Sequence, residues 1–230
     1  MTATTRTETV ELDDDSRLRL TVAEPDSTVR GGIVVLHEAR GVTDTVRSLV
    51  SSLADEGWLA VAPHLYHRDG ADEVDSEHVA DQVNRLTPES VLCDSDAALE
   101  WLADRGVAAD RIGVLGFDLG AAVAVKVGTR RPVGAAVSVS APGVLNPVGT
   151  QLRPLLDTAP ELTCPWLGIF GGDDTVPAED VEKLRDAAAS APVATDVVRY
   201  PEANHRFDTD PVSAIDAWQR TLNWFDSHLR

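Results

Sequence analysis

The chain has 230 residues, of which 38 are acidic and 20 are basic, so its formal net charge is −18. Nucleic acids and anionic membranes are not expected as partners of so acidic a chain, because they carry negative charge themselves. Hydrophobic residues make up 43% of the sequence, an ordinary share for a globular protein. No apolar run approaches the roughly 20 residues that a membrane span needs.

The kinds of charged residue are unusual. The only lysines are Lys126 and Lys183, aspartate outnumbers glutamate, and the acidic residues are spread along the chain apart from a short run at residues 13–15. This composition resembles that of halophilic proteins from salt-loving archaea, in which molar salt screens the repulsion between acidic groups. A bacterial genome of high GC content would produce the same bias. The composition therefore bears on working conditions rather than on the reaction.

The predicted elements begin with residues 10–22, whose alternating pattern indicates an antiparallel strand or hairpin. Residues 32–36 form a continuous apolar run that is typical of a buried strand. The further elements predicted are helices at residues 43–56, 75–86, 88–105, 119–129, 178–190 and 211–229, and strands at residues 58–62, 112–115, 133–140, 165–170 and 196–200. Strands that alternate with helices predict an α/β fold, with a mostly parallel central sheet and helices on both faces.

The chain is expected to form a single domain over residues 1–230, since no repeat divides it. Residues 141–163 lack clear periodicity and contain four prolines, which predicts an ordered loop with about one turn of helix. This segment is too short for a separate cap domain. Ligands on parallel sheets bind outside the carboxyl ends of the strands, so the functional residues are expected there.

The two cysteines, Cys93 and Cys164, have neither the spacing of a metal site nor that of a disulfide framework. We expect both to be reduced, buried thiols. The N-terminal residues lack the apolar region of a signal peptide. Together these features predict a cytoplasmic protein.

The most informative motif is Gly116-Phe117-Asp118-Leu119-Gly120, which stands between a predicted buried strand and a predicted helix. This arrangement is the signature of a nucleophile elbow, a sharp strand-to-helix turn that carries the attacking residue. The glycines leave room where a side chain would collide with the neighbouring backbone. The central residue is usually serine or cysteine, and here it is Asp118.

Two further residues complete a predicted catalytic triad. Asp173 and His205 each follow a later strand, so nucleophile, acid and histidine occur in the chain order of α/β-hydrolases. A histidine in this position acts as a base, and the acid orients its ring. Taken singly, each is more often a turn or surface residue. The three at the ends of the right strands predict a catalytic site.

The loop after residues 32–36 has the sequence His37-Glu38-Ala39-Arg40-Gly41. In α/β-hydrolases this loop donates one N–H group of the oxyanion hole, and the residue after the nucleophile donates the other. The predicted donors are the backbone amides of Ala39 and Leu119. The carboxylate of Glu38 is expected at the mouth of the same site.

These motifs together resemble the dienelactone hydrolase family of α/β-hydrolases, from about residue 31 to the C-terminus. The segments that carry the resemblance are residues 37–42, 62–68, 116–120, 172–177 and 200–207. The resemblance implies a compact hydrolase of small-molecule esters or lactones without a large cap. It further implies that Glu38 controls the protonation of the nucleophile and that Tyr66 and Arg68 help to bind a substrate carboxylate. We expect no metal or cofactor, and a monomer or homodimer.

Two residues depart from the family pattern. Asp118 replaces the usual cysteine or serine, and Arg206 follows the histidine where a small residue is commoner. We interpret Arg206 as the partner of a nearby surface acid such as Asp208 or Asp210. The alternative is that Arg206 brings positive charge to the pocket mouth and contacts the substrate.

An aspartate on the elbow changes the chemistry that is open to the site. Attack of a carboxylate on an ester carbonyl gives an anhydride, a poor intermediate, whereas attack on an sp³ carbon displaces a halide or opens an epoxide and leaves an ordinary enzyme ester. The resemblance to the family therefore predicts a hydrolase of a small-molecule ester or lactone. The chemistry of Asp118 predicts the alternative, a dehalogenase or epoxide hydrolase that uses Asp118 as the nucleophile.

Two more hypotheses follow from Asp118. Glu38 nearby would place two carboxylates in one pocket, so that the pair shares a proton and hydrolysis proceeds by water without a covalent step. In the second hypothesis Asp118 is inert. The chain is then a non-catalytic homologue that keeps a ligand pocket, or Asp118 is an engineered substitution of the usual cysteine or serine. The sequence itself leaves these alternatives open.

Overall fold

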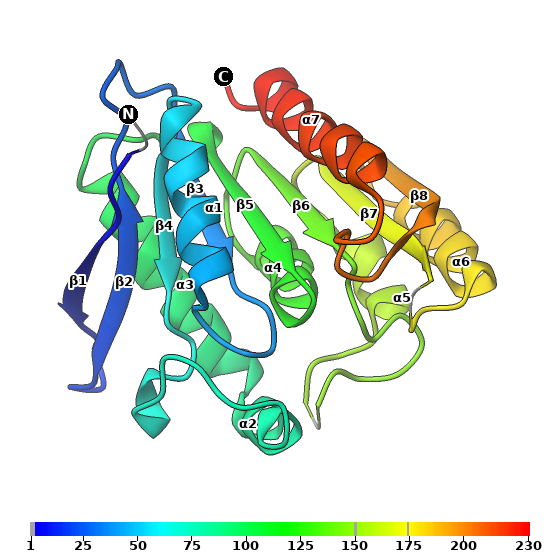
Figure 1. The fold of residues 1–230 in the computed structure, drawn as a ribbon, viewed down its shortest axis with the longest axis horizontal. Coiled ribbons are helices and arrows are strands. Elements are labelled where there is room, and N and C mark those ends of the chain that lie inside the picture. Colours follow the sequence, from blue (N-terminus) through cyan, green and yellow to red (C-terminus); the bar gives the residue numbers. More distant parts are fainter. Residues whose placement is uncertain (1–2, 150, 174) are drawn as a thin grey trace.

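The computed structural model describes residues 3–149, 151–173 and 175–230, with Asp173 described by its backbone alone. Its strands form one eight-stranded sheet in the order β1-β2-β4-β3-β5-β6-β7-β8 (Figure 1). The strands are β1 (Arg6–Glu11), β2 (Arg17–Ala23), β3 (Gly32–Leu36), β4 (Leu59–Pro63), β5 (Ile112–Phe117), β6 (Ala135–Val139), β7 (Trp166–Asp173) and β8 (Thr195–Asn204). β2 runs antiparallel to β1 and β4, and the remaining neighbours are parallel. The prediction of a mostly parallel sheet is confirmed.

Helices cover both faces of the sheet, as predicted. α1 (Asp44–Asp55) and α7 (Pro211–His228) lie on one face, in front of the sheet in Figure 1. α3 (Pro88–Ala103), α4 (Leu119–Arg130) and α6 (Ala178–Ala188) pack on the other. Each face has its own apolar core, so the two sides of the sheet are stabilised separately.

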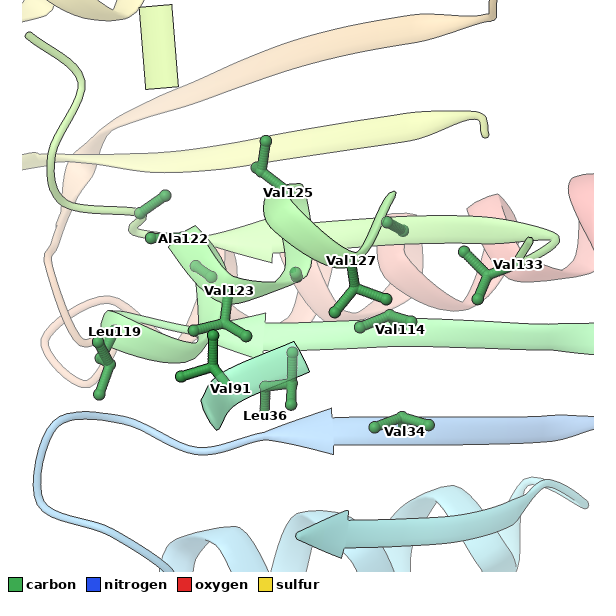
Figure 2. Close-up of a cluster of buried hydrophobic side chains, with 14 of the residues drawn as sticks. Val34, Leu36, Val91, Val114, Leu119, Ala122, Val123, Val125, Val127 and Val133 are labelled. Carbon is green, nitrogen blue, oxygen red and sulfur yellow. The ribbon is translucent and has the colours of Figure 1, made fainter. Parts of the chain in front are cut away.

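The core behind the elbow is tightly packed. Leu36 of β3, Val91 of α3 and Val123 of α4 are fully buried and belong to one cluster (Figure 2). Burial of each such side chain contributes roughly 1.5–3 kcal/mol. The helix that follows the elbow is thereby held against the sheet, which fixes the position of the turn at its start.

Some predicted elements differ in extent. α2 (Val79–Arg85) is shorter than the predicted helix at residues 75–86, and it lies beyond the carboxyl ends of the parallel strands (Figure 1). In the loop predicted at residues 141–163, the described residues include the short helix α5 (Leu155–Thr158), which is followed by a 3₁₀ turn.

Two further predictions from the sequence concern the burial of the cysteines and the lack of a membrane-spanning segment. Both cysteines are free thiols, but Cys93 is partly exposed, whereas Cys164 is buried as expected. Among the described residues, no helix has both the length and the apolar character needed to cross a membrane.

Candidate active site

The elbow adopts a strained turn at the end of β5. Asp118 has φ +48° and ψ −118°, in a region that side-chain-bearing residues seldom adopt. A Cβ atom on Gly116 would lie 2.0 Å from the carbonyl oxygen of Gly120, and one on Gly120 would lie 2.1 Å from that of Leu36. Both glycines are therefore required sterically, as the motif predicts.

The backbone of the turn is tied to both neighbouring strands. The amide of Asp118 donates to the carbonyl of Val139 at the end of β6, and the amide of Gly120 donates to the carbonyl of His37 after β3, each at 3.0 Å. These two bonds hold the Asp118 side chain above the carboxyl end of the sheet. The structure thus pre-organises the central residue of the elbow before any ligand binds.

The two oxygens of the Asp118 carboxylate have different surroundings. Oδ2 accepts a hydrogen bond from the backbone amide of Ala39 at 3.1 Å, and the Leu119 amide also interacts favourably with the carboxylate. Oδ1 lies 3.5 Å from Nε2 of His205. The two amides expected to form an oxyanion hole thus face the carboxylate itself. One of its oxygens occupies the position that a developing oxyanion would take.

This arrangement decides the protonation state of Asp118. Burial acts to raise the pKa of the carboxyl, but the His205 ring and the amides of Ala39 and Leu119 together outweigh burial and bring the pKa below its ordinary value. Asp118 is therefore a carboxylate at neutral pH. The lowered pKa of Asp118 argues against a proton shared between Asp118 and Glu38, which the sequence suggested.

His205 lies in a tight turn directly after β8. Ser140 Oγ donates to the backbone carbonyl of His205 at 2.6 Å, and the amide of Phe207 donates to the carbonyl of Asn204 at 3.1 Å. Ser140 and Phe207 both have positive φ angles, of +53° and +56°. These contacts fix the turn and aim the imidazole at Asp118.

Ser140 is a site residue that the sequence analysis missed. It is buried at the end of β6, and it lines the same cavity as Asp118 and His205. The available signal was a hydroxyl residue directly after a buried strand, at the edge of the sheet where the other site residues gather.

The predicted acid, Asp173, ends β7, and its backbone pairs with Asn204, the residue before His205. The register therefore brings the acid position next to the histidine, as the triad requires. The side chain of Asp173 lies outside the described part of the structure. Its role in orienting His205 stays a prediction.

Glu38 and Arg206 form an ion pair at the cavity. Nη2 of Arg206 donates to both carboxylate oxygens of Glu38, at 3.2 and 3.1 Å, and both residues line the cavity that contains Asp118. The interpretation that Arg206 pairs with Asp208 or Asp210 is wrong for the described contacts. Asp208 instead exchanges two hydrogen bonds with Asn204, and Asp210 caps α7 through Ser213.

The structure does not bring Tyr66 and Arg68 to this cavity. Tyr66 is 1% exposed, and its hydroxyl donates to the carbonyl of Ala39 at 2.7 Å, so it supports the loop that carries the Ala39 amide. Arg68 is paired with the fully buried carboxylate of Asp94, at 2.7 and 2.9 Å. Both groups therefore have internal partners, and neither residue lines the cavities that contain Asp118. The substrate-binding role expected for Tyr66 and Arg68 stays a prediction.

The cavity over the elbow has a volume of about 300 Å³. Apolar side chains from α1, from the ends of β5 and β6 and from the turn after His205 make up much of its wall, namely Val46, Leu49, Phe117, Val139 and Phe207. A concave, largely apolar wall with a few convergent polar groups is typical of a small-molecule site.

A possible metal-binding group lies elsewhere in the sequence. The exposed side chains of Asp75, Glu77 and His78 bring three potential ligand atoms together in the described part of the chain. None of these residues lines the cavities that contain Asp118.

Comparison with known proteins agrees with the fold and the motifs. The model of the dienelactone hydrolase family matches residues 18–229. A putative carboxymethylenebutenolidase from Yersinia pestis is 34% identical over 209 residues, which cover 85% of this chain and 78% of that protein. The carboxymethylenebutenolidase of Rhodococcus opacus is 29% identical over 221 residues, covering 90% of this chain and 85% of that protein.

A solved structure shows the same architecture. The crystal structure of a putative dienelactone hydrolase from Klebsiella pneumoniae subsp. pneumoniae MGH 78578 superposes with a TM-score of 0.90 and 28% sequence identity. The match covers 99% of this chain and 100% of that one, so no additional domain separates the two folds.

Proposed function

Since the chain belongs to the dienelactone hydrolase family and is a hydrolase, we propose that Asp118 attacks an sp³ carbon of a small-molecule substrate and that His205 then directs water at the resulting ester. One observation carries the proposal. The Asp118 carboxylate places Oδ2 against the Ala39 amide and leaves Oδ1 facing His205.

In the first step, Oδ1 of Asp118 forms a bond to the substrate carbon while the leaving group departs with the bonding electron pair. The leaving group is a halide or the oxygen of an opened epoxide, and the product is an alkyl ester of Asp118. The guanidinium of Arg206 lines the cavity and offers N–H donors to the departing anion. The low pKa of Asp118 keeps the nucleophile ionised.

In the second step, His205 takes a proton from water, and the water oxygen attacks Cγ of Asp118. Negative charge then develops on Oδ2, which already accepts the Ala39 amide. The tetrahedral intermediate collapses, the alcohol oxygen leaves with a proton from His205, and the Asp118 carboxylate is restored. The oxyanion hole thus serves the hydrolysis of the enzyme ester rather than the attack on the substrate.

A second candidate is the hydrolysis of a small-molecule ester or lactone. It is favoured by the relatives, which are carboxymethylenebutenolidases by name. In this route water activated by His205 attacks the substrate carbonyl, and Asp118 has to surrender the Ala39 amide to the substrate oxygen. The resting geometry of Oδ2 favours the first candidate.

The two candidate functions are distinguished by trapping the alkyl ester of Asp118, which only the first candidate forms. The His205→Gln variant, incubated at high salt with haloacids, bromoalkanes, epoxides, lactones and small esters, is expected to accumulate an alkyl adduct on Asp118, seen by intact-mass and peptide mass spectrometry. The Asp118→Asn variant is the matched control and is expected to form no adduct. Wild-type protein in heavy-oxygen water would in addition incorporate the label into Asp118 during turnover.

Other outcomes have definite meanings. Turnover of a lactone or ester without an adduct and without label in Asp118 would support the second candidate. The absence of adduct, label and turnover with every compound would leave a ligand-binding protein without catalysis.

A further inference from the structure

A second cavity lies on the other side of the elbow. It has a volume of about 270 Å³, and Asp118 lines both this cavity and the one that contains His205. Ala39 and Leu119, whose amides face the carboxylate, line the second cavity. The reacting group therefore stands between two cavities rather than at the bottom of one.

The second cavity is apolar. Val79 and Val83 of α2 line it on one side, and Pro142 and Val148 of the loop after β6 line it on the other. Among its described lining residues, polar side chains come from Asn84 and Asp118. Asp118 is the one charged residue in this described lining, so the cavity is suited to binding rather than to acid–base chemistry.

The partly exposed apolar side chains of α2 indicate that this helix contacts a ligand. It is a short helix whose apolar residues Val79 and Val83 are one turn apart, and both side chains remain partly exposed. Gln82, on another side of the helix, is the buried residue, and it donates to Asp69 at 2.6 Å. The helix is thus anchored by a polar contact, while its apolar side chains line the cavity.

We propose that the second cavity is the subsite for an aliphatic arm of the substrate, and that the substrate spans the elbow. This inference rests on the proposed function, because it takes Asp118 as the reacting residue. It assigns the substrate to compounds with a short unbranched or branched alkyl chain attached to the reacting carbon.

The stereochemistry of the displacement reaction supports placing the leaving group in the first cavity and the alkyl arm in the second. The leaving group departs on the side of the carbon opposite to the attacking oxygen, so the remaining substituents project sideways from the line of attack. The first cavity has to hold the leaving group near Arg206 and later a water beside His205. An alkyl substituent that projects over Leu119 enters the second cavity, so the first cavity stays free for the leaving group and the water.

The binding test uses hexanol as a probe, which cannot react with Asp118. Saturation-transfer NMR is expected to detect hexanol bound to the wild type, with the signal strongly reduced in Val83→Trp, which fills the cavity. Asp81→Trp adds the same bulk to an exposed residue of α2 outside the cavity, and it is expected to bind hexanol as the wild type does. Ala80→Phe, at an exposed lining position, is a second filling variant in case the first does not fold.

The kinetic test compares bromoethane with bromohexane, and nitrophenyl acetate with nitrophenyl hexanoate. In Val83→Trp the ratio of kcat/KM for the long chain to that for the short chain is expected to fall by at least about tenfold, since a few methylenes in a pocket give discrimination of that size. Asp81→Trp is expected to keep the wild-type ratio.

The failure of this inference differs from that of the proposed function. Equal hexanol binding and an unchanged chain-length ratio in both filling variants would overturn the subsite, even if Asp118 is alkylated. Hexanol binding that is lost in the filling variants, without adduct or turnover in the wild type, would keep the subsite and overturn the proposed chemistry.

Discussion

At the scale of single residues, His37 connects the loop at residues 37–41, which carries the Ala39 amide, to the protein core. Its Nδ1 donates to the carbonyl of Glu38 at 2.7 Å, and its Nε2 accepts the amide of Leu65 at 3.2 Å, so the ring is held as the neutral tautomer with the proton on Nδ1. Burial lowers the pKa of His37 from 6.5 to about 4. The unfolded chain therefore binds a proton at a higher pH than the folded chain does.

This difference predicts the pH dependence of stability. Because the folded pKa is depressed, acidification below the unfolded value favours the unfolded state, and His37 alone should remove about 2 kcal/mol of stability between about pH 7 and about pH 4.5. Urea unfolding across this range tests it. His37→Asn keeps a donor for Glu38 and should be less stable at neutral pH, yet lose less stability on acidification. Equal losses in the two proteins would contradict the prediction.

At the scale of elements, the elbow depends on the close approach of α4 to β3. A Cβ atom on Gly120 would meet the carbonyl oxygens of Leu36 and His37 at 2.1 and 2.6 Å, and neither backbone group can move independently of the sheet. Gly120→Ala is expected to lower the free energy of unfolding by more than about 3 kcal/mol and to abolish turnover. Urea unfolding and the trapping assay measure both effects.

The matched control lies in the same helix. A Cβ atom on Gly128 would lie 3.2 Å from the side-chain ends of Cys164 and Leu162, which can adjust. Gly128→Ala also gains helix propensity, by up to about 1 kcal/mol, so its stability should stay near that of the wild type. A Gly120→Ala variant as stable as Gly128→Ala would show that the close approach is not needed.

The elements could be predicted because their signals are local. Thr87 and Pro88 mark the start of α3, where Thr87 forms a capping box with Ser90, and the elbow glycines mark the turn before α4. The edge of the parallel sheet then brings Asp118 and His205 together without further information.

The contacts that the sequence did not predict depend on pairing between distant loops. Arg206 faces Glu38, 168 residues earlier, and its sequence neighbours Asp208 and Asp210 are used by local turns and caps. The Tyr66 hydroxyl is taken by the Ala39 carbonyl, which no local pattern indicates. The second cavity, likewise, forms only when α2 meets the loop after β6.

At the scale of the whole molecule, the cavities and most of the charged residues lie in different places. The cavities lie at the carboxyl edge and are largely apolar, with the polar groups gathered around Asp118. The net charge of −18 is distributed over the surface, where arginine ion pairs such as Arg6–Glu24, Arg130–Glu161 and Arg153–Glu161 join separate segments of the chain. Exposed pairs of this kind are worth about 1 kcal/mol or less each, so they do not cancel the repulsion among the excess acids.

The charge predicts a stability that depends on salt. Raising KCl from about 0.1 M to about 1 M shortens the Debye length from about 10 Å to about 3 Å, which screens repulsion between exposed acids on neighbouring elements. We expect the thermal midpoint to rise steeply over this range and to level off beyond it, with folded structure lost in dilute buffer. Circular dichroism during heating measures this. Sucrose at equal osmolality is the control, because it does not screen charge. A protein that is fully stable in dilute buffer and indifferent to KCl would show that its acidic surface reflects genome composition rather than adaptation to salt.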